Sequence, residues 1–213
     1  MRTCYARLAL AAVFSAICLS GSALAQSSQD LYGTLTEGRY SNNLLKFELS
    51  IPDGWLVVES EDQKAAKEIG RAAVQTGNAR ADALIDESLK KDVIVLFVSE
   101  KPLGAIGNAV FGISITKLPA KGYTPKMLAE SFKSAFLQNP KNRVAKEISL
   151  ENIGGLTWAN VLLDLDFFGQ PVHNNYFVTV VGDYALVSNM SYQNSDQLRK
   201  MDAALRGIKF KRK

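Results

Sequence analysis

Apolar and polar residues alternate along several segments of the chain, and a period of two predicts β-strands. In residues 44–51, every second residue from Leu45 to Ile51 is apolar. The run 93–98 is apolar throughout, which predicts a buried central strand. Further strands are predicted near Leu31 and at 55–58, 109–118, 144–151, 156–168, 171–181 and 184–192.

Other segments have helical spacing. Thr124-Pro125 predicts a helix start, since threonine caps well and proline suits the first turn, and Asn139-Pro140 ends that helix. Asn194-Ser195-Asp196-Gln197 resembles a capping box and opens a last helix. A helical pair is expected around 60–91. Strands in succession with separate helices indicate an α+β fold, with helices against an antiparallel sheet.

The apolar pattern also predicts which helical residues enter the core. We expect Phe132 and Phe136, from the helix that begins at Thr124, to share one core with Phe97 of the central strand.

The N-terminus has the layout of an export signal. Arg2 and Arg7 are followed by the apolar run 8–19 and then by small residues. This predicts a cleavable signal peptide over residues 1–25, with the cut between Ala25 and Gln26. The run of 12 residues is shorter than the ~20 that span a bilayer, although a retained anchor is the alternative. We therefore expect a secreted or periplasmic protein without a transmembrane segment in its mature chain.

Cysteine and charge content narrow the class of protein. The two cysteines, Cys4 and Cys18, lie in the segment expected to be removed, so the mature chain would have no disulfide or thiolate. Five basic residues lie between Arg206 and Lys213, which indicates a solvated basic terminus and no nucleic-acid groove. Residues 26–213 contain no Pro/Gly/Ser-rich linker and are expected to form a single domain.

The only histidine supplies the best candidate for site chemistry. If Gly169-Gln170 forms a two-residue turn, Asp166 faces His173, and Asp164 faces Asn175 on the same side. These polar groups could contact a divalent cation. We favour the interpretation that this face is solvated and carries only an Asp–His pair. A change of one residue in the pairing of the two strands would separate the four polar side chains. We therefore assign no metal ligand and no catalytic residue.

One glycine loop resembles a nucleotide-binding loop only superficially. Gly104-Ala105-Ile106-Gly107 follows a strand, but its spacing is not G-x-G-x-x-G and another strand comes next. We expect a simple connection between strands, and no cofactor.

Three short motifs resemble PsbP-like domains. They are the strand from Tyr40 that runs into Ile51-Pro52-Asp53-Gly54-Trp55, the turn Ile153-Gly154-Gly155-Leu156, and the ending Ile208-Lys209-Phe210. The resemblance implies a central antiparallel sheet of about six strands between helices, an α/β/α sandwich. It also implies a binding or assembly factor without catalytic residues. The helical pair around 60–91 departs from the simplest pattern and is expected to be an insertion.

Three functions remain open. The first is a secreted or periplasmic, non-enzymatic binding or assembly module for an envelope protein, which predicts an exposed patch. The second is an envelope hydrolase or metal-dependent enzyme that uses Asp164, Asp166 and His173, which requires converging polar groups. The third is a carrier of a small apolar ligand between sheet and inserted helices, which requires a large apolar pocket. The sequence favours the first, with another envelope or secreted protein as partner, and leaves the oligomeric state open.

Overall fold

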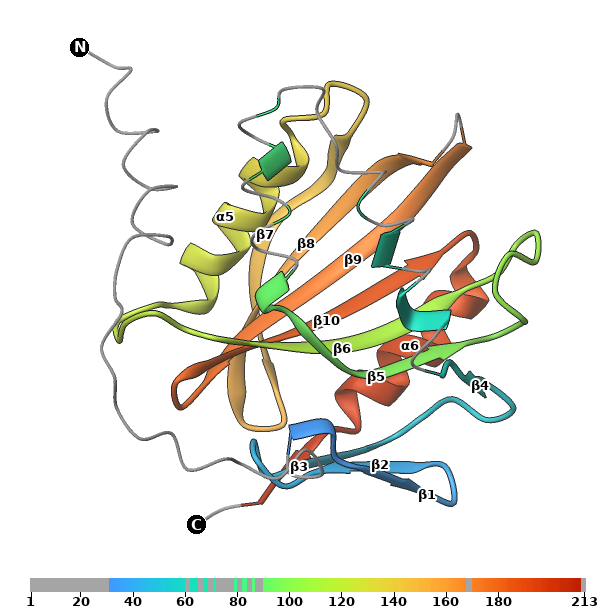
Figure 1. Cartoon of the computed structure of the whole chain (residues 1–213), viewed down its shortest axis with the longest axis vertical. Helices are drawn as coiled ribbons and strands as arrows, with labels where there is room; N and C mark the ends of the chain where they lie inside the picture. The colour runs from blue at the N-terminus through green and yellow to red at the C-terminus, as the bar shows by residue number, and fades with distance from the viewer. Residues whose placement is uncertain are drawn as a thin grey trace.

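The computed structural model of the 213-residue chain describes residues 31–59, 62–64, 67–68, 71, 79, 82–83, 86, 90–167 and 170–211 (Figure 1). The expected cleavage site at Ala25 and Gln26 lies outside the described residues, as does much of the expected helical insertion. The side chains of residues 166, 167, 170 and 171 are also outside them.

A seven-stranded antiparallel sheet forms the centre of the molecule (Figure 1). Its order is β4-β5-β6-β10-β9-β8-β7. The strands are β4 (Leu56–Val57), β5 (Val93–Ser99), β6 (Val110–Lys117), β7 (Arg143–Ile153), β8 (Leu156–Phe167), β9 (Gln170–Val181) and β10 (Tyr184–Tyr192). The strands predicted between 93 and 192 are thus present, because each has enough apolar residues on a pleated face to be found by its pattern.

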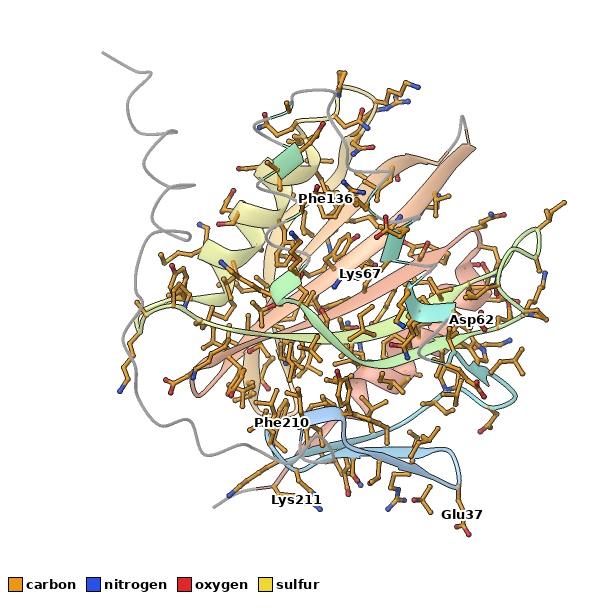
Figure 2. All side chains as sticks on the ribbon, in the orientation of Figure 1. Glu37, Asp62, Lys67, Phe136, Phe210 and Lys211 are labelled. Atoms are coloured by element: carbon orange, nitrogen blue, oxygen red, sulfur yellow. The ribbon has the colours of Figure 1, made fainter. Side chains whose placement is uncertain are left out.

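A second, four-stranded sheet lies against the first (Figure 1). It contains β1 (Thr34–Thr36), β2 (Arg39–Asn42), β3 (Phe47–Ser50) and β11 (Lys209–Phe210) in that order. The expectation of a central antiparallel sheet of about six strands is therefore confirmed in part, since the central sheet has seven strands and the second sheet was not expected. The alternation in 44–51 is real, but β3 pairs with β2 and with the C-terminal β11, whose Phe210 is labelled in Figure 2. The ring centroids of Phe47 and Phe210 are 5.9 Å apart.

Helix α5 (Pro125–Phe136) covers one face of the large sheet over β7, β8 and β9. The Thr124 hydroxyl accepts a hydrogen bond from the Met127 amide at 3.2 Å, which confirms the predicted cap. Phe132 and Phe136 stack on Tyr176, with centroids 6.2 and 5.0 Å apart. Phe97 lies over Gly112 and is not part of this cluster of described residues, so only two of the three expected phenylalanines share it.

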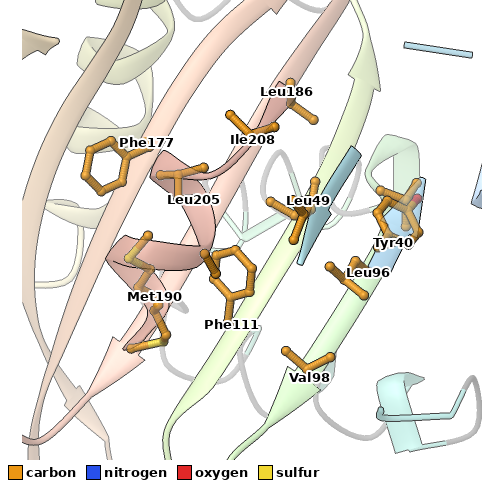
Figure 3. Packing of buried hydrophobic residues seen from close by; sticks show 14 of the residues in the cluster. Tyr40, Leu49, Leu96, Val98, Phe111, Phe177, Leu186, Met190, Leu205 and Ile208 are labelled. Atoms are coloured by element: carbon orange, nitrogen blue, oxygen red, sulfur yellow. The ribbon is translucent and has the colours of Figure 1, made fainter. Parts of the chain in front are cut away.

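Helix α6 (Ser195–Arg206) and the small sheet cover the opposite face. The Asn194 side chain accepts hydrogen bonds from the amides of Asp196 and Gln197, as the capping pattern predicted. Leu205 and Ile208 enter a large apolar core with Leu49 of β3 and residues of β5, β6, β9 and β10 (Figure 3). One outer layer is thus a helix and a sheet together. Within the described residues, no helix is long and apolar enough to cross a membrane.

Candidate functional site

The β8–β9 hairpin determines where the predicted polar residues lie. Its register pairs Asp164 with His173 and Asp166 with Pro171, and the last described pair is Phe167 with Gln170. The expected pairing of Asp166 with His173 was wrong by two positions, because the hairpin closes one residue earlier than Gly169-Gln170. A shift of two keeps each side chain on its face, so the predicted face is correct although its partners are not.

Asp164 and His173 form a direct contact. The Oδ1 atom of Asp164 lies 2.7 Å from Nδ1 of His173, and the two side chains are 33% and 46% exposed. The remaining members of the expected cluster do not join them. Asn175 accepts a hydrogen bond from the Asn160 side chain instead. The side chain of Asp166 lies outside the described residues.

Two residues on neighbouring strands extend this pair into a row across four strands. Arg143 of β7 lies opposite Asp164, and Tyr192 of β10 lies opposite His173. We call these four residues the polar row. The rings of His173 and Tyr192 are 5.4 Å apart. Arg143 is exposed and makes no ion pair with any other residue that the structure describes.

The electrostatics of the row keep the tyrosine neutral. Burial raises the pKa of Tyr192, and the nearby charge of Asp164 raises it further. The phenol therefore remains a hydrogen-bond donor at neutral pH. Across the described part of the chain, no three His, Cys, Asp or Glu side chains are grouped so that they could hold a metal ion.

Sequence reasoning missed Arg143 and Tyr192 for different reasons. Val181 pairs with Tyr184 across Gly182-Asp183, and counting outward from that turn leads directly to Tyr192 opposite His173. The same counting from the Gly154-Gly155 turn fails for Arg143. The β7–β8 register shifts twice between Val144 and Ser149, so bulges decide which residue lies beside Asp164.

The loop between β5 and β6, residues 100–109, lies at the same end of the large sheet as the polar row (Figure 1). We call it the β5–β6 loop. It connects two strands as expected, and side chains hold its shape. Asn108 accepts a hydrogen bond from the Lys101 amide at 2.9 Å and donates one to the Lys101 carbonyl at 3.1 Å. The buried Gln197 of α6 donates to the Gly107 carbonyl at 2.9 Å and to Glu100 at 2.8 Å.

An isoleucine occupies the tip of this loop. Ile106 is 96% exposed, and Leu103 on the same loop is 37% exposed. The Lys101 ammonium group donates to the carbonyls of Ile106 and Gly107 at 3.3 and 3.4 Å. The loop therefore presents an apolar side chain on a backbone that is already hydrogen-bonded.

A shallow pocket of about 70 Å³ lies elsewhere, beside the small sheet and the end of α6. Arg39, Glu48 and Lys209 line it together with Leu49, Ser50 and Gly207. Ligand pockets usually enclose roughly 300–1,000 Å³, so this one is too small and too polar for a carried apolar ligand.

No protein-family model and no curated protein matches the chain. Among solved structures, it is similar to cyanobacterial PsbP (CyanoP) from Synechocystis sp. PCC 6803, with 11% identity and a TM-score of 0.51 over 81% of this chain and 91% of that one. It is also similar to LpqN of Mycobacterium tuberculosis, described as involved in cell envelope biogenesis. That match has 15% identity and a TM-score of 0.46 over 76% of this chain and 82% of LpqN. The chain has a PsbP-like fold, and at these identities the comparisons show the fold alone.

Proposed function

We propose that the chain is an exported, non-enzymatic module that binds another envelope or secreted protein through the polar row. The arrangement of Arg2, Arg7 and the apolar run 8–19 supports export. The observation that carries the docking surface is the exposed Arg143, which has no ion-pair partner in the described part of the chain and lies beside the Asp164–His173 pair.

The composition of the row suits a protein interface. Arginine and tyrosine are enriched at interfaces and dominate their binding energy. Arg143 can bind a carboxylate of a partner with two parallel hydrogen bonds. Tyr192 is buried, with 7% of its surface exposed, and its ring packs against the partly exposed ring of His173, so the histidine ring is the aromatic surface that a partner can reach. We therefore expect the partner to present an acidic side chain next to an apolar or aromatic one.

The row is also positioned before any partner arrives. Its four residues are carried by adjacent hydrogen-bonded strands, and Asp164 restrains the His173 ring. A surface built on sheet strands loses little conformational entropy on binding. The two other functions have less support. The enzyme hypothesis rests on the Asp164–His173 pair alone. The carrier hypothesis places its pocket between the sheet and the inserted helices, which lie largely outside the described residues, and the pocket beside the small sheet is too small for such a ligand.

Site-specific photo-cross-linking in the producing cell tests this function. A photoreactive amino acid at position 173 should give a discrete protein adduct, and Arg143→Glu in the same chain should abolish it. The matched control places the photoreactive residue at Met127, which is 51% exposed on α5. An adduct that persists with Arg143→Glu, or that forms equally from position 127, would contradict the proposal.

A further inference from the structure

The exposure of Ile106 is not needed for the shape of the β5–β6 loop. Asn108 and Gln197 hold the loop through hydrogen bonds to Lys101 and Gly107, and the Ile106 side chain contributes almost no contact area. Full exposure of an isoleucine forgoes the stabilisation that burial would give. The side chain is therefore available for contact with something outside the chain.

Several backbone groups at the tip of the loop already have hydrogen-bond partners within the chain. The Ala105 amide donates to the Pro102 carbonyl at 3.1 Å, and the Asn108 amide donates to the Ala105 carbonyl at 3.3 Å. The carbonyls of Ile106 and Gly107 accept from Lys101, and that of Gly107 also accepts from Gln197. These bonds fix the shape of the tip, whereas the amides of Ile106 and Gly107 have no hydrogen-bond partner among the described residues and need acceptors such as those of a headgroup layer.

The charges around the tip leave one cation without a carboxylate. Glu100 pairs with Lys200 at 3.1 Å, and Asp196 pairs with Arg199 at 2.5 Å. The Lys101 ammonium group is hydrogen-bonded to carbonyl oxygens and forms no ion pair among the described residues, and its charge contributes a little to the lowered pKa of Glu100. The ammonium group thus lies just behind the apolar tip, in the order that an anionic lipid surface requires, with the charge among headgroups and the apolar group deeper.

We infer that the β5–β6 loop inserts Ile106 into the surface of a membrane that contains anionic lipids, with Lys101 at the level of the phosphates. A lipid surface suits the tip better than a protein does. A stable protein interface buries about 800 Å² per partner, which one protruding side chain cannot supply. Shallow insertion requires less contact area, and one apolar tip with a nearby cation gives weak, reversible membrane binding. This inference goes beyond the proposed function, since it uses other residues and another kind of partner.

Vesicle co-sedimentation tests the inference. Purified protein, with its N-terminus verified by intact mass, is mixed with vesicles of phosphatidylcholine alone or of equimolar phosphatidylcholine and phosphatidylglycerol. We expect binding to the mixed vesicles, weakened by about tenfold or more in Ile106→Asp. Met127→Asp, an equally polar change at an exposed position on α5, should bind as the wild type does. Lys101→Gln should reduce the preference for anionic vesicles.

Two outcomes would overturn the inference: no binding of the wild type to mixed vesicles, or equal binding of wild type and Ile106→Asp. A discrete protein adduct from a photoreactive residue at position 106, together with vesicle binding that Ile106→Asp does not weaken, would assign the tip to a protein instead. The polar-row adduct from position 173 is measured separately, so failure of the lipid contact and failure of the proposed function are distinguishable. Unchanged thermal unfolding of Ile106→Asp serves as the folding control.

Discussion

A β-carbon placed on Gly154 would lie 2.9 Å from the carbonyl oxygen of Ile208. The turn between β7 and β8 therefore rests directly on the segment that leads into β11. Gly154 and Gly155 have φ angles of +61° and +83°, as expected for a two-residue hairpin turn of type I′. Two of the motifs that resemble PsbP-like domains, the glycine pair and the ending at Phe210, are thus in contact.

Gly154→Ala should destabilise the protein by about 2–3 kcal/mol, because a side chain there is strained at positive φ and also collides with Ile208. Gly155→Ala is the matched control, since its φ is also positive but no atom lies within 4 Å of its β-carbon. It should cost only about 1 kcal/mol. Urea unfolding measures both, and equal losses would show that the contact with Ile208 is unimportant.

Gln197→Ala should loosen the β5–β6 loop. The Gln197 amide group accepts from the Gln193 backbone and donates to Gly107 and Glu100, so its loss removes three hydrogen bonds, two of which connect α6 to the loop, although Lys101 still donates to Gly107 and Lys200 to Glu100. We expect a cost of about 1–3 kcal/mol and faster hydrogen exchange at residues 101–108. Gln138→Ala is the control, because Gln138 bonds only to an exposed carbonyl of its own helix. If hydrogen exchange at residues 101–108 is unchanged in Gln197→Ala, then Gln197 does not hold the β5–β6 loop.

The free energy of unfolding of Asp92→Asn, measured relative to that of the wild type, should increase as the pH rises. Burial raises the pKa of Asp92 above its ordinary value of 3.8, against the opposing effects of Thr116 and Lys67. A raised folded pKa gives stability that is complete below the unfolded pKa and is lost as the pH rises through the folded pKa. Asparagine keeps an acceptor for Thr116 without the charge. Urea unfolding at a series of pH values measures the difference.

Glu100→Gln provides the opposite control for this experiment. Hydrogen bonds from Gln197 and then Lys200 hold the pKa of Glu100 below its ordinary value. Its stabilisation is therefore present above the unfolded pKa and is lost as the pH falls through the folded pKa. The two variants should differ from the wild type with opposite slopes. A pH-independent difference for Asp92→Asn would contradict the assigned cause.

His173→Ala should change the free energy of unfolding by less than about 1 kcal/mol, because the Asp164–His173 pair is partly exposed to solvent. We also expect no tight, one-to-one binding of a transition metal, since a metal site needs more ligands than this pair supplies. Calorimetry that detects such binding, abolished by His173→Ala, would favour the metal-dependent enzyme instead.

Protein recovered from the producing cell should begin at Gln26. The cut after Ala25 follows from the small residues that end the apolar run 8–19. Intact-mass spectrometry tests this directly. A chain that still contains residues 8–19 would show that the segment is kept as an anchor.

Local patterns predicted most elements of the fold. The caps at Thr124 and Asn194 depend on hydrogen bonds within three residues, so they are visible in a short stretch of sequence. The strands from β7 to β10 follow one another through short turns, and each has its own apolar alternation. The division into two sheets was not visible, because the pairing of β11 with β3 joins segments about 160 residues apart.

The sequence by itself determined the elements that depend on local patterns and the face of the hairpin on which Asp164 and His173 lie. These depend on helical and strand periods, which any window of the chain displays. Tertiary structure alone decided that Arg143 flanks the pair and that Gln197 holds the β5–β6 loop with Ile106 at its tip. Bulges in β7 and a helix about 90 residues further along produce these contacts, and no local period encodes either of them.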